Sequence, residues 1–175
     1  MINMYDCRNG VLVRKAEATV PGPETVWIDL VNPTADDEAL IERALGLDVP
    51  TRDEVREIEA SSRFYEEDGG TFMTTSIIYF PDNMTPTTGS VTFILKETRL
   101  VTVRYVEPRA FPVFASRAEK GAVSCNSGGT VMIGLIETIV DRIADVIERI
   151  QDDVEKLTHN VFNLNTQRRD SSRRL

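Results

Sequence analysis

One stretch of the chain constrains the fold more than any other. From Thr130 to about Leu164, apolar residues recur every three or four positions. This stretch contains no proline, and its only glycine is Gly134. This spacing places the apolar side chains on one face of an α-helix. Those residues are Met132, Ile136, Ile139, Ile143, Ile147, Ile150, Val154, Leu157, Val161 and Leu164. A helix of this kind would be roughly 50 Å long, more than a small domain needs. We therefore expect it to extend beyond the domain or to pack against another long helix.

The residues before this helix alternate between short strands and helices. Period-two apolar patterns and turn residues predict strands at 1–6, 11–15, 25–30, 63–66, 71–80, 90–96 and 100–106. Capping signals at Thr34 and Thr51 predict two helices, and a third is expected over 109–120. We predict an α/β fold, in which one mixed sheet of about seven strands is covered by helices on its faces. This domain would occupy 1–125, and the long helix 130–175.

Charge and composition exclude several classes of protein. The chain of 175 residues carries 28 acidic against 20 basic residues, a net charge of −8. Its basic cluster is limited to the last residues, so a nucleic-acid binder is not expected. The acidic excess favours cations or basic partners. His159 is the single histidine and the two cysteines are far apart, so neither a catalytic triad nor a closed zinc site is expected, and we predict that the chain is not an enzyme.

Two groups of acidic residues are candidate metal ligands. Asp141, Asp145, Glu148 and Asp152 recur on the long helix at spacings that place them opposite the apolar face. Glu54, Glu57 and Glu59 lie on or near the short helix that begins after Thr51. Carboxylate oxygens suit hydrated divalent cations such as Mg²⁺. The alternative is a solvated helix face with weak ion pairs, and spacing alone leaves both interpretations open.

Several motifs resemble a known family. They are the strand WIDL at 27–30, the helix PTRDEVREIE at 50–59, the hairpin that starts with SSRFY at 61–65, the strand pair at 91–105 and the long helix over 135–157. In this order they resemble the cytosolic N-terminal domain of the CorA family of divalent-cation transporters, which includes the ZntB branch. The resemblance covers most of the chain after about Val26.

The resemblance implies an α/β/α sandwich and a function. In the family, divalent cations bound between neighbouring cytosolic domains of a homopentamer hold the pore closed. The implied ion is Mg²⁺, or Zn²⁺ or Co²⁺, bound weakly by residues from the two acidic groups. The implied place is the cytoplasmic face of the cell membrane. Members of the family contact the membrane through helices that follow the region resembled here. We therefore expect this sequence to be the soluble piece of a longer protein.

Two other functions stay open at this point. A ZntB-like zinc transporter domain would have the same fold, with acidic faces that raise the local cation concentration without gating. A soluble oligomerisation module would instead pair through the apolar face at 136–164.

Overall fold

The computed structural model describes residues 1–16, 20–59, 62–80 and 85–172, with side chains as far as Thr158. It divides into two compact units, Met1–Ile139 and Val140–Leu175. The proposed division into domains at 125–130 remains a prediction. His159, Val161, Leu164 and the C-terminal arginines lie outside the described side chains.

The first unit is built on one sheet. Its strands, among the described residues, are β1 (Ile2–Arg8), β2 (Val11–Arg14), β3 (Thr25–Val31), β4 (Phe64–Glu67), β5 (Gly70–Tyr79), β6 (Thr87–Lys96) and β7 (Arg99–Arg104). They lie in the order β2-β1-β3-β7-β6-β5-β4. The pair β3 and β7 is parallel, with Ile28 opposite Val101, and the other described pairs are antiparallel. The predicted mixed sheet of about seven strands is confirmed.

Local signals place the short helices. The helix α1 (Ala35–Leu45) begins after Thr34, whose side chain and that of Asp37 form a reciprocal capping box, and it ends at Gly46 in the left-handed conformation. The helix α2 (Arg52–Glu57) begins after Thr51 with a second capping box. It is shorter than the sequence predicted, because Ile58 already has an extended backbone. The helix α3 (Ala110–Glu119) follows β7.

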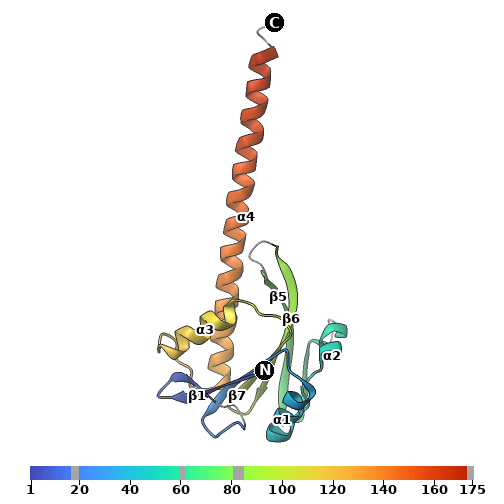
Figure 1. Cartoon of the computed structure of the whole chain (residues 1–175), viewed down its shortest axis with the longest axis vertical. Coiled ribbons are helices and arrows are strands. Elements are labelled where there is room, and N and C mark those ends of the chain that lie inside the picture. The colour runs from blue at the N-terminus through green and yellow to red at the C-terminus, as the bar shows by residue number, and fades with distance from the viewer. Residues whose placement is uncertain (17–19, 60–61, 81–84, 173–175) are drawn as a thin grey trace. The chain divides into compact units, whose positions relative to one another are not determined.

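Helices lie on both faces of the sheet, as Figure 1 shows. One face packs with Ile41 of α1 and with Leu47 and Val49 into an apolar core. The strands contribute to the same core Met4, Ile28, Leu30, Phe72, Ile94, Val101 and Val103. On the other face, Trp27 stacks on Tyr5 at 4.5 Å between ring centroids and meets Phe114 of α3 edge-on at 5.7 Å. The predicted arrangement of helix, sheet and helix layers is confirmed.

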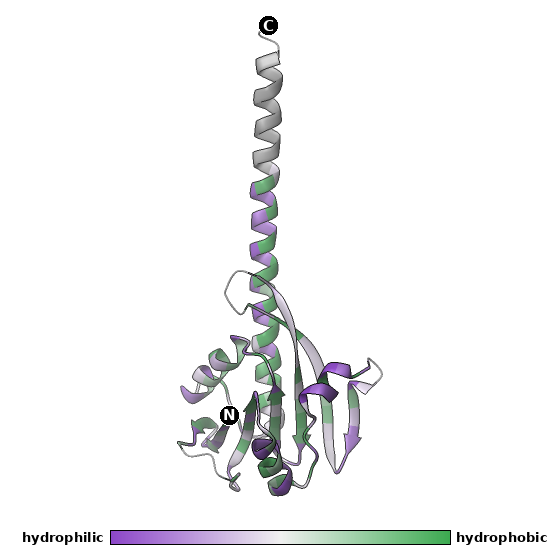
Figure 2. Cartoon of the chain, turned by 45° about the vertical axis from the view of Figure 1, so that its right-hand side comes forward, coloured by the Kyte–Doolittle hydropathy of each residue, from purple (hydrophilic) through white to green (hydrophobic). Residues whose placement is uncertain are grey.

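The helix α4 (Gly128–Ser172) begins within the first unit. Val131, Leu135 and Thr138 in its first turns are buried there. Hydrophobic and hydrophilic stretches alternate along the described part of α4 (Figure 2), as expected for an amphipathic helix. In the second unit, however, most of the apolar side chains are not covered: Ile147, Ile150 and Val154 are each more than half exposed, and Leu157 is 64% exposed. No helix among the described residues is long and apolar enough to span a membrane.

A buried ion pair ties the two parallel strands together. Asp29 of β3 accepts hydrogen bonds from Nε and a terminal nitrogen of Arg104 on β7, each at 2.9 Å. Thr102 Oγ1 donates to the same carboxylate at 2.9 Å, and Asn3 Nδ2 donates at 3.3 Å. The indole of Trp27 in turn donates to Thr102 Oγ1 at 3.0 Å. Because both charges are buried and their hydrogen bonds are made, the pair is tolerated inside the domain.

We expect Asp29→Asn to lower the free energy of unfolding by about 3–5 kcal/mol, because the substitution leaves the Arg104 guanidinium buried without its charge partner. Urea unfolding followed by circular dichroism measures this. The double substitution Asp29→Leu with Arg104→Met should recover much of the loss, since it removes both charges. As a control, Glu24→Gln breaks the contact with Arg8 at 3.8 Å, whose side chains are over 60% exposed, and should leave stability within error. Equal effects of Asp29→Asn and Glu24→Gln would contradict the assignment.

A second prediction concerns the start of α4. A Cβ on Gly128 would collide with the backbone of Arg99 and Leu100, whereas one on Gly129 would meet only Ser127 Oγ at 3.7 Å. We expect Gly128→Ala to destabilise the protein by about 1–3 kcal/mol through overpacking. Gly129→Ala should be neutral or stabilising by up to about 1 kcal/mol, because alanine favours the helix. The same urea measurement compares the two, and equal stabilities would show that α4 does not begin against β7 in this way.

Candidate metal centre

Glu54 is engaged in the fold of its own helix. Its Oε2 accepts hydrogen bonds from the Thr51 backbone nitrogen at 2.9 Å and from Thr51 Oγ1 at 2.8 Å. These bonds hold the pKa of the Glu54 carboxyl below its usual value, with the backbone hydrogen bond as the largest cause. The carboxylate is therefore ionised at neutral pH. One of its oxygens serves as a helix cap, which leaves Oε1 for any other ligand.

Glu57 and Glu59 lie at the opposite end of α2. Glu57 is the last residue of the helix, Glu59 lies two residues further along the chain, and both side chains are exposed. Val55 on the other side of α2 is only 4% exposed, so it anchors the helix and directs the acidic face to solvent. Neither carboxylate has a hydrogen bond or ion pair within the part of the chain that the structure describes.

A cavity beside α2 brings in two acidic residues that are not among the predicted metal ligands. Asp48 and Glu67, together with Glu54, line a cavity of about 230 Å³ whose wall includes Tyr65. Burial raises the pKa of the Tyr65 hydroxyl, and neighbouring carboxylates, Glu67 first among them, act in the same direction. Asp48 follows Leu47 directly, and no spacing in the sequence relates it to the glutamates of α2.

The acidic row on α4 is exposed, as predicted. Asp141, Asp145, Glu148 and Asp152 follow one another at steps of four, three and four positions, and all four side chains are exposed. Asp145 pairs with Arg142 at 3.4 Å, with both side chains largely in solvent, so the pair contributes little to stability. Across the described residues, the other three carboxylates have no hydrogen-bond or ion-pair partner.

The candidate ligands do not converge within one chain. Among the residues that the structure describes, no three Cys, His, Asp or Glu side chains form a group able to hold a metal ion. The glutamates near α2 belong to the first unit and the row on α4 to the second. Each group therefore offers separate carboxylates, which can attract a hydrated cation but would need further ligands to enclose one.

Comparisons with known proteins agree on the family. The magnesium transport protein CorA of Escherichia coli K12 is 34% identical over 147 residues, which is 83% of this chain and 46% of that protein. The chain thus spans about half the length of the curated relatives it matches.

Solved structures share the fold. The CorA magnesium transporter from Methanocaldococcus jannaschii matches with a TM-score of 0.70 at 14% identity, over 91% of this chain and 50% of the other. The ZntB cytoplasmic domain from Vibrio parahaemolyticus matches with a TM-score of 0.61 at 17% identity, over 84% of this chain and 62% of the other.

A profile described as CorA-like Mg²⁺ transporter protein matches residues 23–175. This range includes the strand, helix and hairpin motifs that carried the resemblance, and it covers most of the chain. The chain therefore belongs to the family of CorA-like Mg²⁺ transporter proteins.

Proposed function

We propose that this chain is the cation-sensing and assembly part of a CorA-like transporter that moves Mg²⁺ across the membrane. In this proposal it lies at the cytoplasmic face of the cell membrane and has no enzymatic activity. The whole protein would be a homopentamer, and divalent cations bound between subunits would regulate it. The 34% sequence identity to a magnesium transport protein favours Mg²⁺ over Zn²⁺ or Co²⁺ as the transported ion.

One observation carries the proposal: in the second unit, α4 has two exposed faces of opposite chemistry. The apolar face exposes Ile147, Ile150, Val154 and Leu157 by more than half. A helix with such a face gains stability when another surface covers it. The opposite face carries the acidic row. Copies of the helix that associate through the apolar face would keep the acidic row on their outer side, where it stays open to a cation and to carboxylates of a neighbouring chain.

The sensing step follows from electrostatics. Carboxylates on neighbouring subunits repel one another when no cation is bound, and a divalent cation between them turns the repulsion into attraction. Occupancy then favours one of two packings of the subunits. The exposed carboxylates of Glu57, Glu59, Asp141, Glu148 and Asp152 have no competing partner in the described part of the chain and are available for this role. Binding to an isolated chain is expected to be weak, because no group of ligands is complete.

We expect millimolar MgCl₂ to raise the melting temperature of the chain by a few degrees relative to KCl at the same ionic strength, because a ligand bound only to the folded state stabilises it. The double substitution Asp141→Asn with Asp145→Asn should abolish this increase and leave the fold intact, since both side chains are exposed. Differential scanning fluorimetry measures the shift.

The matched control is Glu119→Gln with Asp153→Asn, which removes the same charge from exposed positions outside the acidic row. This variant should keep the full increase. If the first variant responds to Mg²⁺ like the original chain, the row on α4 is not the sensor. A larger response to ZnCl₂ than to MgCl₂ would favour the ZntB-like function instead.

Association through α4 is tested separately by sedimentation equilibrium. We expect weak, concentration-dependent association of the chain, which Ile150→Glu with Leu157→Glu abolishes by placing charges on the apolar face. The control Arg149→Gln with Lys156→Gln makes the same change of net charge on the polar side and should still associate. Loss of association in both variants would indicate a general charge effect, and the apolar face would then have no specific role.

A further inference from the structure

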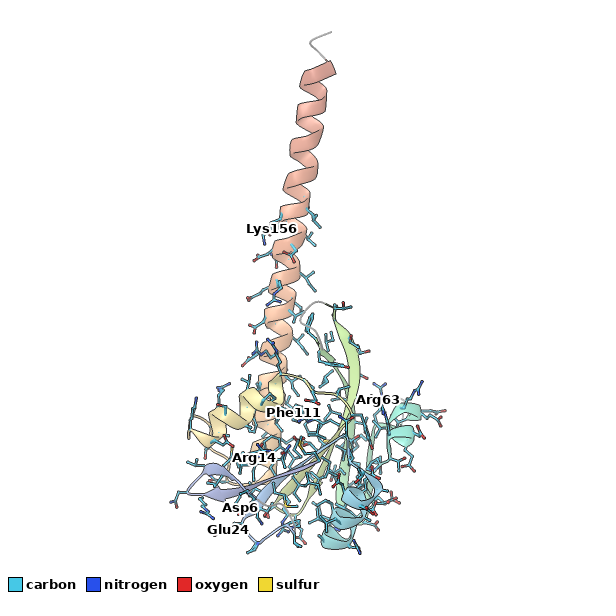
Figure 3. All side chains as sticks on the ribbon, in the orientation of Figure 1. Asp6, Arg14, Glu24, Arg63, Phe111 and Lys156 are labelled. Atoms are coloured by element: carbon cyan, nitrogen blue, oxygen red, sulfur yellow. The ribbon has the colours of Figure 1, made fainter. Side chains whose placement is uncertain are left out.

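A cavity on the face of the sheet that packs against α3 is unrelated to the acidic groups. Its volume is about 240 Å³, which is below the roughly 300–1,000 Å³ of sites for drug-sized ligands, so it suits a small molecule. Its lining comes from β1, β2, β3, β7 and α3, all within the first unit. Arg14 of β2 and Phe111 of α3, which belong to this lining, are labelled in Figure 3.

One side of the cavity is formed by the ion pair between Asp29 of β3 and Arg104 of β7. Arg104 donates to Asp29 from two nitrogens, and its guanidinium lies 4.5 Å from the centroid of the Phe111 ring. Arg104 is 6% exposed and Asp29 is 2% exposed. This part of the wall is therefore rigid and close to neutral, because the two charges are matched to each other.

The remaining polar groups of the lining have hydrogen-bonding capacity that the protein does not use. Tyr5 is only 6% exposed, yet within the described residues its hydroxyl makes no hydrogen bond. Arg109 is exposed and has no hydrogen bond or ion pair from its side chain within that same part of the chain. Arg14 donates to Asn3 Oδ1 at 2.6 Å, which uses one of its five N–H groups. Among the described residues Arg99 Nε is the one fully buried side-chain nitrogen or oxygen without a partner, so the Tyr5 hydroxyl is accessible and can donate to a molecule in the cavity.

The charge of the lining is opposite to that of the chain. Its side chains include three guanidinium groups, Arg14, Arg104 and Arg109, against the carboxylates of Asp29 and Glu107. The cavity thus has an excess of positive charge in a protein of net charge −8. Apolar surface from Trp27, Phe111 and other residues of α3 completes the wall.

We propose that this cavity binds a small organic carboxylate. The two carboxylate oxygens accept hydrogen bonds from Arg14, Arg109 and the Tyr5 hydroxyl, and the apolar part of the molecule lies against Trp27 and Phe111. The planar fork of a guanidinium matches a carboxylate in two parallel hydrogen bonds, which gives the site its selectivity for this group.

The state of Tyr5 supports this role. Burial raises the pKa of its hydroxyl to about 12, and the nearby Asp29 carboxylate acts in the same direction. The hydroxyl therefore keeps its proton throughout the physiological range and can donate to an anion. This site is separate from the cation proposal, and its test does not depend on Mg²⁺.

Trp27 provides the measurement, because it is the one tryptophan in the chain and it lines the cavity. Titration of the full chain with sodium benzoate should change Trp27 fluorescence saturably, and titration with benzyl alcohol, which has the same ring without the charge, should not. Arg14→Gln and Arg109→Gln should each weaken benzoate binding about tenfold, the loss expected for a charge-assisted hydrogen bond. Tyr5→Phe keeps the ring against Trp27 and should also weaken binding.

The matched control is Arg117→Gln, which removes the same charge from an exposed position of α3 outside the lining. Benzoate binding to this variant should equal that of the original chain. Three results would overturn the proposal: no saturable change with benzoate, equal binding of benzyl alcohol, or equal weakening by Arg117→Gln. Saturation by inorganic phosphate but not by benzoate would also overturn it, since the site would then not select carboxylates.

Discussion

The arrangement of the first unit depends on the contact between two parallel strands that are far apart in the sequence, and this contact contains the ion pair between Asp29 and Arg104. It joins β3 to β7, the one parallel pair among the described strands. Parallel neighbours cannot be connected by a tight hairpin, so the chain forms α1, α2 and three strands before it returns to this position. The residues of the pair are 75 positions apart. Their hydrogen bonds, together with those of Thr102 and Asn3, fix both strands in register and fill the centre of a face that otherwise packs aromatic rings.

The start of the helix α4 is buried in the first unit, whereas its later part, in the second unit, is largely exposed. Its first turns are packed so closely that glycine is needed against the backbone of β7 at Gly128 and against the Phe114 ring at Gly134, where a Cβ would lie 2.5 Å from a ring carbon. Beyond Ile139 most of the apolar side chains are exposed and the acidic row has few partners. One continuous helix is thus anchored by tight packing at its start and left with two unsatisfied faces further along. This difference is the physical basis for the proposed assembly and sensing.

Local charge, more than net charge, distinguishes the surfaces of this protein. The acidic excess is found on α1, on α4 and around the cavity that Asp48 shares with Glu54 and Glu67. The cavity beside Asp29 has the opposite sign, because Arg14 and Arg109 add to an ion pair that is already neutral. A cation and a small anion could therefore bind the same chain at different places, with little competition between them.

The sequence by itself determined the features that depend on neighbours along the chain. The capping boxes at Thr34 and Thr51, the period of α4, the strands and the family motifs all rest on contacts within a few residues or on regular spacing. Only the tertiary structure decided that Asp29, a single charge in the apolar strand TVWIDLV, pairs with Arg104, and that residues of five elements line one cavity. The reason is that these contacts depend on which strands become neighbours and in which register, and no local pattern encodes that choice.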